Sequence, residues 1–188
     1  MYVRDAKKRE EVWLLDRFEE FGFEDPAFRS RDYVFAVDED TGEKAGFGRL
    51  RIHTEGGESV CEITNIGVLD EWRGQGVGAH VVEALVDDAE EEGLDVVYSL
   101  TEEPDYLEQF GFERVDEADL PEKLRDRLDE ERAIADGGVT PVRVAVDEFA
   151  IPRDLRGRFE GEDEGEQETA EDFGIDAESA TYKYDTGR

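Results

Sequence analysis

The chain has 188 residues, of which 53 are acidic and 22 basic, and its formal net charge is −31. This length suits one domain with a single sizeable core, and the lack of a basic stripe argues against a nucleic-acid-binding protein. The acidic residues are spread along the chain, whereas an acidic mimic of nucleic acid would gather them on one face.

Lysine is scarce, because only 5 of the basic residues are lysines and 17 are arginines. Such an acidic surface repels itself in dilute buffer and is tolerated where salt screens the charges. The composition therefore resembles that of proteins from a high-salt cytoplasm, and we expect a halophilic, haloarchaeal source. With one cysteine, Cys61, and no stretch of 18 apolar residues, the sequence predicts a soluble cytoplasmic protein without disulfides or membrane contact.

The first half of the chain predicts one helix and an antiparallel meander of strands. Apolar residues recur at helical spacing after a short apolar start at Tyr2 and Val3, and β-rich runs follow with glycine-rich turns between them. We expect a helix over 6–21 and strands over 33–37, 45–53 and 60–68.

The second half of the chain alternates helices with strands. We expect helices over 76–93, 105–110 and 120–135, and strands over 94–100, 112–115 and 140–151. From Arg153 onward the composition turns polar, with 8 acidic residues and no base over 160–172. We therefore expect one domain over residues 1–152 and a partly disordered acidic tail over residues 153–188.

A glycine-rich stretch, Arg73-Gly74-Gln75-Gly76-Val77-Gly78-Ala79, lies where the strand over 60–68 gives way to a helix. Glycines let backbone N–H groups turn toward one point, and the helix that begins there adds unpaired N–H groups and the positive end of its dipole. These features predict an anion site for a phosphate group, with Arg73 as a fixed positive charge at its mouth.

Two other interpretations of this loop fit the sequence less well. Residues 74–79 match the G-x-G-x-x-A pattern of dinucleotide-binding folds, but the loop follows a meander, and Asp95 opens the next strand instead of ending it. A purely structural turn would not need three alternating glycines behind an arginine.

Residues 73–78 also match the R/Q-x-x-G-x-G/A signature of the GNAT superfamily of acyl-CoA N-acyltransferases, which the chain resembles over residues 1–152. The resemblance extends to "ITNIGVLDEW" before the loop and "YLEQFGFERV" after it. It implies an α+β fold with a central twisted mixed sheet of about six or seven strands flanked by helices. It also implies acetyl-CoA as co-substrate, with its pyrophosphate on the amides of Gln75 to Ala79 and its pantetheine arm along Ile66, Gly67 and Val68.

The same resemblance implies direct transfer of the acetyl group to a primary amine, with Glu62 as the general base. Glu62 lies 11 residues before Arg73, the position of the glutamate base in the histone-acetyltransferase branch, and partial burial would raise its pKa. Strand alternation places Glu62, Thr64 and Ile66 on one face. A backbone N–H near Val68 would stabilise the oxyanion.

For the general acid we expect Tyr106 or a water molecule, because Leu107 stands where many family members have a tyrosine. Cys61 is expected to be a core residue. The two histidines, His53 and His80, have no ligand spacing with another His or Cys, so we expect no metal.

Within the superfamily, "SLTEEPDYLEQFGFERVDEADLPEKLRDR" is similar to the acetyltransferase domain of N-acetylglutamate synthases. That resemblance implies the α-amine of an amino acid such as glutamate as acceptor. Arg49 and Arg51 share one face of their strand and could pair with its carboxylates. A protein or peptide amine, N-terminal or on a lysine, or a polyamine would instead prefer acidic residues at the mouth. A non-catalytic acetyl-CoA sensor, an acidic module that docks a basic partner, and a homodimer also remain open.

Overall fold

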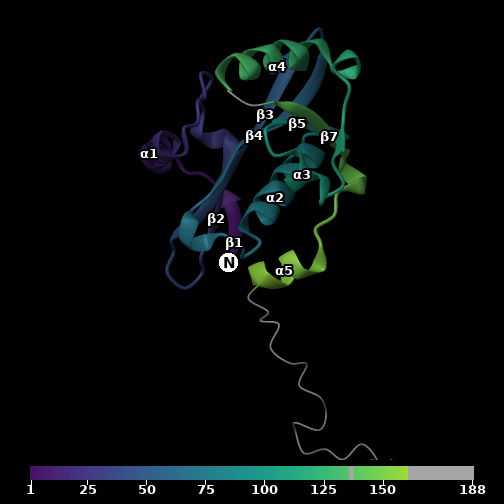
Figure 1. Cartoon of the computed structure of the whole chain (residues 1–188). Coiled ribbons are helices and arrows are strands. Elements are labelled where there is room, and N and C mark those ends of the chain that lie inside the picture. The colour runs from purple at the N-terminus through teal and green to yellow at the C-terminus, as the bar shows by residue number, and fades with distance from the viewer. Residues whose placement is uncertain (136–137, 161–188) are drawn as a thin grey trace, which may run out of the picture.

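One sheet of 7 strands, in the order β1-β2-β3-β4-β5-β7-β6, forms the centre of this computed structural model, which describes residues 1–135 and 138–160 (Figure 1). Neighbouring strands are antiparallel except β4 and β5, which are parallel. The α+β fold with a mixed sheet is therefore confirmed. The strands are β1 (Tyr2–Asp5), β2 (Tyr33–Val37), β3 (Lys44–Glu55), β4 (Glu58–Val68), β5 (Val96–Thr101), β6 (Glu113–Arg114) and β7 (Thr140–Ala145).

Helices cover both faces of the sheet (Figure 1). Helix α2 packs on one face, where α3 and α5 join the same apolar cluster, while α1 and α4 lie on the opposite face. No described helix is long and apolar enough to cross a membrane. The helices are α1 (Glu11–Phe21), α2 (Val77–Glu91), α3 (Pro104–Glu108), α4 (Glu122–Ile134) and α5 (Arg153–Glu160).

Strand β2 shows why helices are needed on both faces, because all of its residues are buried. Successive strand side chains point to opposite faces of a sheet. Val34 and Ala36 accordingly join the cluster under α2, and Tyr33, Phe35 and Val37 join the cluster under α1.

The end of the described chain differs from the sequence-based prediction. The last strand, expected over 140–151, ends at Ala145, and a 3-10 helix follows over Val146–Glu148. Residues Arg153–Glu160, which the composition assigns to the acidic tail, form α5. Leu155 and Phe159 are four residues apart, so they share one face of this helix and pack on the cluster that contains α2. The rest of the predicted tail, residues 161–188, lies outside the described residues.

A β-bulge in β4 changes the face that its later side chains occupy. Asn65 and Ile66 together oppose Gly48 of β3, and Asn65 has a left-handed φ of 52°. Beyond the bulge the alternation is inverted, so Ile66 packs with the cluster under α2. The prediction that Ile66 shares a face with Glu62 and Thr64 is therefore wrong.

We expect Gly48→Ala to lower the free energy of unfolding by about 1–3 kcal/mol, the usual cost of overpacking a core. A Cβ at this position would lie 2.7 Å from Val81 Cγ1 and 3.0 Å from Leu85 Cδ1, so these side chains of α2 would have to shift within a packed core. Urea unfolding in molar KCl measures the change. Gly138→Ala is the control, because a Cβ there meets nothing within 4 Å. Equal stability of the two variants would contradict the described packing.

Candidate active site

A cavity of about 1220 Å³ lies where β4 and β5 separate. The two strands pair only over Cys61–Ile63 and Val97–Ser99, although both continue beyond these residues. Their separated ends line the cavity together with residues 21–26 and residues of α3 and α4. Unpaired backbone groups at a strand edge can form hydrogen bonds with an extended ligand.

The glycine-rich loop connects this cavity to the start of α2. Arg73 lines the cavity and is exposed, with a salt bridge of 3.2 Å to Asp70. Gly76 precedes the helix with a left-handed φ of 73°. The N–H groups of residues 77–79 lie in the first turn, where a helix offers them no carbonyl partner and its dipole places partial positive charge. The loop therefore has the geometry of an anion site.

Tyr106 of α3 lies against the first turn of α2. Its hydroxyl is so near Gly78 that a Cβ at this glycine would overlap it. Burial raises the pKa of Tyr106 to about 12, so the hydroxyl is protonated at neutral pH. Since Tyr106 also lines the cavity, its hydroxyl is a proton donor beside the glycine-rich loop.

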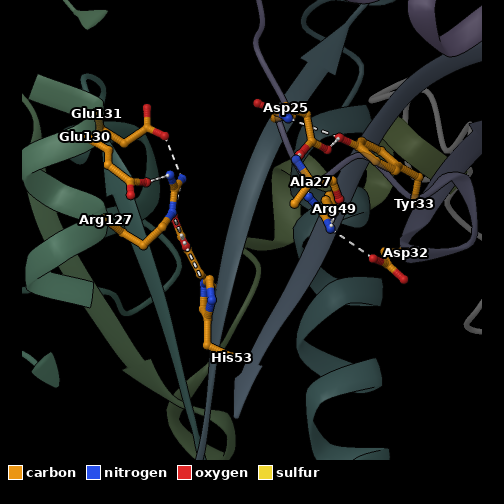
Figure 2. Close-up of polar contacts among 11 residues, drawn as sticks. Asp25, Ala27, Asp32, Tyr33, Arg49, His53, Arg127, Glu130 and Glu131 are labelled. Atoms are coloured by element: carbon orange, nitrogen blue, oxygen red, sulfur yellow. Dashed lines mark hydrogen bonds and ion pairs between the residues drawn. The ribbon is translucent and has the colours of Figure 1, made fainter. Parts of the chain in front are cut away.

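Glu62 of β4 is 1% exposed and belongs to an ionic network with α4. Figure 2 labels His53, Arg127, Glu130 and Glu131 of this network. A hydrogen bond of 2.9 Å joins His53 Nε2 to its carboxylate, and the Arg127 guanidinium lies 3.4 Å from it. Arg127 also pairs with Glu130 at 2.8 Å and Glu131 at 2.6 Å. Burial alone would raise the pKa of Glu62, but His53 and Arg127 outweigh it and hold the pKa below its ordinary value of 4.5. The raised pKa expected from the sequence is therefore wrong.

Arg49 of β3 belongs to a second network, which joins the loop before β2 to the bulge of β4 (Figure 2). Its guanidinium pairs with Asp25 at 2.6 Å and Asp32 at 3.0 Å, and it is 3% exposed. The Tyr33 hydroxyl donates to Asp25 at 2.6 Å and accepts from Asn65 at 3.0 Å. The predicted pairing of Arg49 with a substrate carboxylate is thus replaced by pairing with two carboxylates of the chain.

Arg51 lies next to Glu62 across the β3–β4 pair and is half-buried. It forms no salt bridge with any residue over 1–135 or 138–160. Burial lowers its pKa, and the charge of Arg127 adds to this effect. Of the predicted site residues, Ile66, Val68, Arg73 and Tyr106 line the cavity. Glu62, Arg49, Arg51, Gly67 and residues 74–79 do not.

The cavity-lining residues that were not predicted from the sequence include Arg127, Asp25 and Thr64. Arg127 falls between Leu124 and Leu128 on the buried face of α4, and a charge within an apolar stripe is a signal that the sequence contains. The Thr64 hydroxyl is buried without a hydrogen-bond partner among the described residues. In this part of the chain, no group of three or more His, Cys, Asp or Glu residues is placed to hold a metal ion.

We expect Glu62→Gln to lower the free energy of unfolding at pH 7 by about 2 kcal/mol, less than the usual 3–5 for a broken buried pair, because Arg127 keeps two carboxylates. A carboxyl group with a lowered pKa stabilises the fold above its ordinary value of 4.5 and loses this contribution as the pH falls below it. The variant should therefore lose less stability than the parent on acidification below pH 4.5. Glu131→Gln is the control, with an expected cost below about 1 kcal/mol, since that carboxylate is partly exposed. Equal urea-unfolding curves for the two variants at pH 7 would contradict this account.

The sequence model of the acetyltransferase (GNAT) family matches residues 2–112. An uncharacterized N-acetyltransferase from Chlorobaculum tepidum is 29% identical over 97 residues, which are 51% of this chain and 56% of that protein. The chain therefore spans little more than half the length of this curated relative.

Two solved structures share the fold. N-acetylglutamate synthase from Neisseria gonorrhoeae, complexed with coenzyme A and N-acetyl-glutamate, has a TM-score of 0.62 at 18% identity, over 77% of this chain and 34% of that chain. Rv2747 from Mycobacterium tuberculosis, in complex with CoA, has a TM-score of 0.64 at 17% identity, over 77% and 99% of the two chains. With a family match over more than half of its length, the chain belongs to the acetyltransferase (GNAT) family.

Proposed function

We propose that the protein is an acetyl-CoA-dependent N-acetyltransferase that moves the acetyl group directly to a primary amine. The observation that carries this proposal is the glycine-rich loop at the start of α2, which has the geometry of an anion site and lies beside the cavity between β4 and β5. We also propose a halophilic, haloarchaeal and cytoplasmic protein, for which turnover should rise from dilute buffer to molar KCl.

Acetyl-CoA fits the residues of this site. Its pyrophosphate would accept hydrogen bonds from the N–H groups of residues 75–79 and face Arg73. Its pantetheine arm would pair with the separated edge of β4 over residues 66–68, as an added strand pairs with an open edge. Coenzyme A is present in both solved structures described above, which supports the proposal.

The transfer requires a deprotonated amine, a stabilised oxyanion and a proton for the thiolate. The amine nitrogen attacks the thioester carbonyl, the C–S bond breaks, and a backbone N–H near Val68 would stabilise the oxyanion. Tyr106, protonated at neutral pH, would give its proton to the thiolate. Glu62 would accept the proton of the amine through one water molecule, because its side chain does not line the cavity.

The acceptor that we propose is the α-amine of an amino acid such as glutamate. Arg51 does not line the cavity, so it would pair with a carboxylate of this acceptor that extends past the lining. It is a half-buried cation without a salt bridge to any described residue. Arg49 would instead hold the loop that borders the cavity, through Asp25.

A second candidate acceptor is a cationic amine, such as a peptide N-terminus, a lysine side chain or a polyamine. Four carboxylates line the cavity at the end where α4 and the loop before β2 meet, namely Glu24, Asp25, Glu130 and Glu131. These charges favour a positively charged acceptor over an acidic one.

Four pools of amines are each supplied with acetyl-CoA in molar KCl: acidic amino acids, other amino acids, polyamines and short peptides. We expect one of these pools to cause release of free thiol from acetyl-CoA. If an acidic amino acid is the acceptor, Arg51→Gln should raise its KM about tenfold or more, because a charge-assisted pair is lost. A polyamine acceptor should be insensitive to this change. Binding of acetyl-CoA without turnover of any pool would favour a non-catalytic sensor, and no binding at all would contradict the assignment of the glycine-rich loop.

We expect Glu62→Gln to lower kcat about 10²- to 10⁴-fold without weakening acetyl-CoA binding, since general base catalysis is lost. Because the pKa of Glu62 lies below 4.5, its carboxylate is ionised above that pH. The rise of kcat/KM with pH above 4.5 should therefore follow the titration of the free amine, and the variant should keep this slope. Glu58→Gln is the control, because this glutamate is exposed at the start of the same strand and outside the cavity lining, and it should leave kcat within about twofold. Full activity of Glu62→Gln would exclude Glu62 as the base.

A further inference from the structure

Helix α5 packs on the first turns of α2, beside the glycine-rich loop (Figure 1). The Leu155 carbonyl lies so near Gly76 that a Cβ on this glycine would overlap it. One turn later, the Phe159 ring stacks on His80, with 3.8 Å between ring centroids and 20° between planes. Phe159 is 7% exposed, so the contact is part of the core.

The same helix brings positive charge to the loop. Arg158 donates a hydrogen bond of 3.5 Å to the Gly74 carbonyl, and its side chain is 48% exposed. Asp154 lies 3.9 Å from this guanidinium, at the limit of a salt bridge. Arg156 forms a salt bridge of 2.6 Å with Glu83, which joins α5 to the second turn of α2. A guanidinium beside an anion site is notable in a chain with a net charge of −31.

Helix α2 is thus enclosed at its first turn by three elements. Gly46 of β3 lies against Val77, Tyr106 of α3 lies against Gly78, and Leu155 of α5 lies against Gly76. A loop that is held before the ligand arrives loses less freedom on binding and binds more tightly. The contacts of α5 therefore bear on the affinity for the phosphate-containing substrate.

We propose that α5 is the outer wall of the acetyl-CoA site, an inference that rests on the proposed function of this chain. Leu155 and Phe159 hold the glycine-rich loop in its anion-binding geometry, and Arg158 adds a second cation, beside Arg73, for the pyrophosphate. α5 lies beyond the residues that match the family model, which end at residue 112. It is a positioning element for the loop, and Arg158 is a binding residue.

Arg158 is tested with three probes of decreasing phosphate content, acetyl-CoA, its dephospho form without the 3′-phosphate, and S-acetylpantetheine. Calorimetric titration of the full chain with Arg158→Gln should show about tenfold weaker binding of the first two, since both keep the pyrophosphate, and unchanged binding of the third. Arg153→Gln is the matched control, because it removes the same charge from the same helix without a described contact to the loop.

The supporting role of α5 is tested with Phe159→Ala and with truncation after Pro152. Both should raise the Kd of acetyl-CoA about fivefold or more, while kcat at saturating acetyl-CoA stays within about twofold, because the chemistry of the cavity is untouched. Truncation after Glu160 is the matched control, since it removes residues 161–188 and keeps α5. Urea unfolding in molar KCl establishes that each variant is folded under the assay conditions.

The outcomes separate this inference from the proposed function. If the Arg158→Gln and Phe159→Ala variants bound acetyl-CoA as tightly as the parent, the assignment of α5 as a wall of the site would be overturned. The proposed function would not be affected. Tighter binding after truncation at Pro152 would overturn it too, because α5 would then cover the site. If Arg158→Gln weakened the binding of acetyl-CoA but not that of the dephospho form, the assignment of Arg158 to the pyrophosphate would be overturned. A full chain that binds no acetyl-CoA would overturn the proposed function itself.

Discussion

The early end of the pairing between β4 and β5 is the constraint on which the rest of the structure depends. Within a sheet, nearly every backbone N–H and C=O is paired with a neighbouring strand. Here the pairing ends at Ile63 and Ser99, and the Ser99 hydroxyl donates to the Ile63 carbonyl at 3.1 Å as the strands part. The bulge at Asn65 then turns β4 further. The cavity exists because the sheet opens at this point, and α3 and α4 supply its walls.

Two buried arginines fasten these walls. Arg127 connects α4 to β4, and Arg49 connects the loop before β2 to β3. They are 6% and 3% exposed, and charges so well removed from water are screened far less by salt than surface charges are. The geometry around the cavity should therefore change little over a range of salt concentrations in which the repulsion among the surface acids changes greatly.

Local pattern was sufficient to predict most of the strands, the main helices and the helix that begins at the glycine-rich loop. It could not predict the bulge, because the left-handed conformation of Asn65 is held by a hydrogen bond to Tyr33, which is 32 residues away. The role of Arg49 depends in the same way on Asp25, 24 residues away in a loop. The pKa of Glu62 was predicted in the wrong direction because it is lowered by His53 of the neighbouring strand and by Arg127, which is 65 residues distant. Helix α5 was not predicted, because its apolar face has few residues, Leu155 and Phe159, and borders a strongly acidic stretch.

The contact between Gly78 and Tyr106 has a consequence for the history of the family. The hydroxyl of the tyrosine occupies the space that a Cβ at position 78 would need, so the two positions restrict each other. A relative with alanine or serine in place of this glycine has to turn the tyrosine side chain away, hold α3 farther from α2, or lack the tyrosine. The pair should accordingly be inherited together and change together. In this chain, the missing Cβ of Gly78 leaves the room that the tyrosine hydroxyl of α3 occupies.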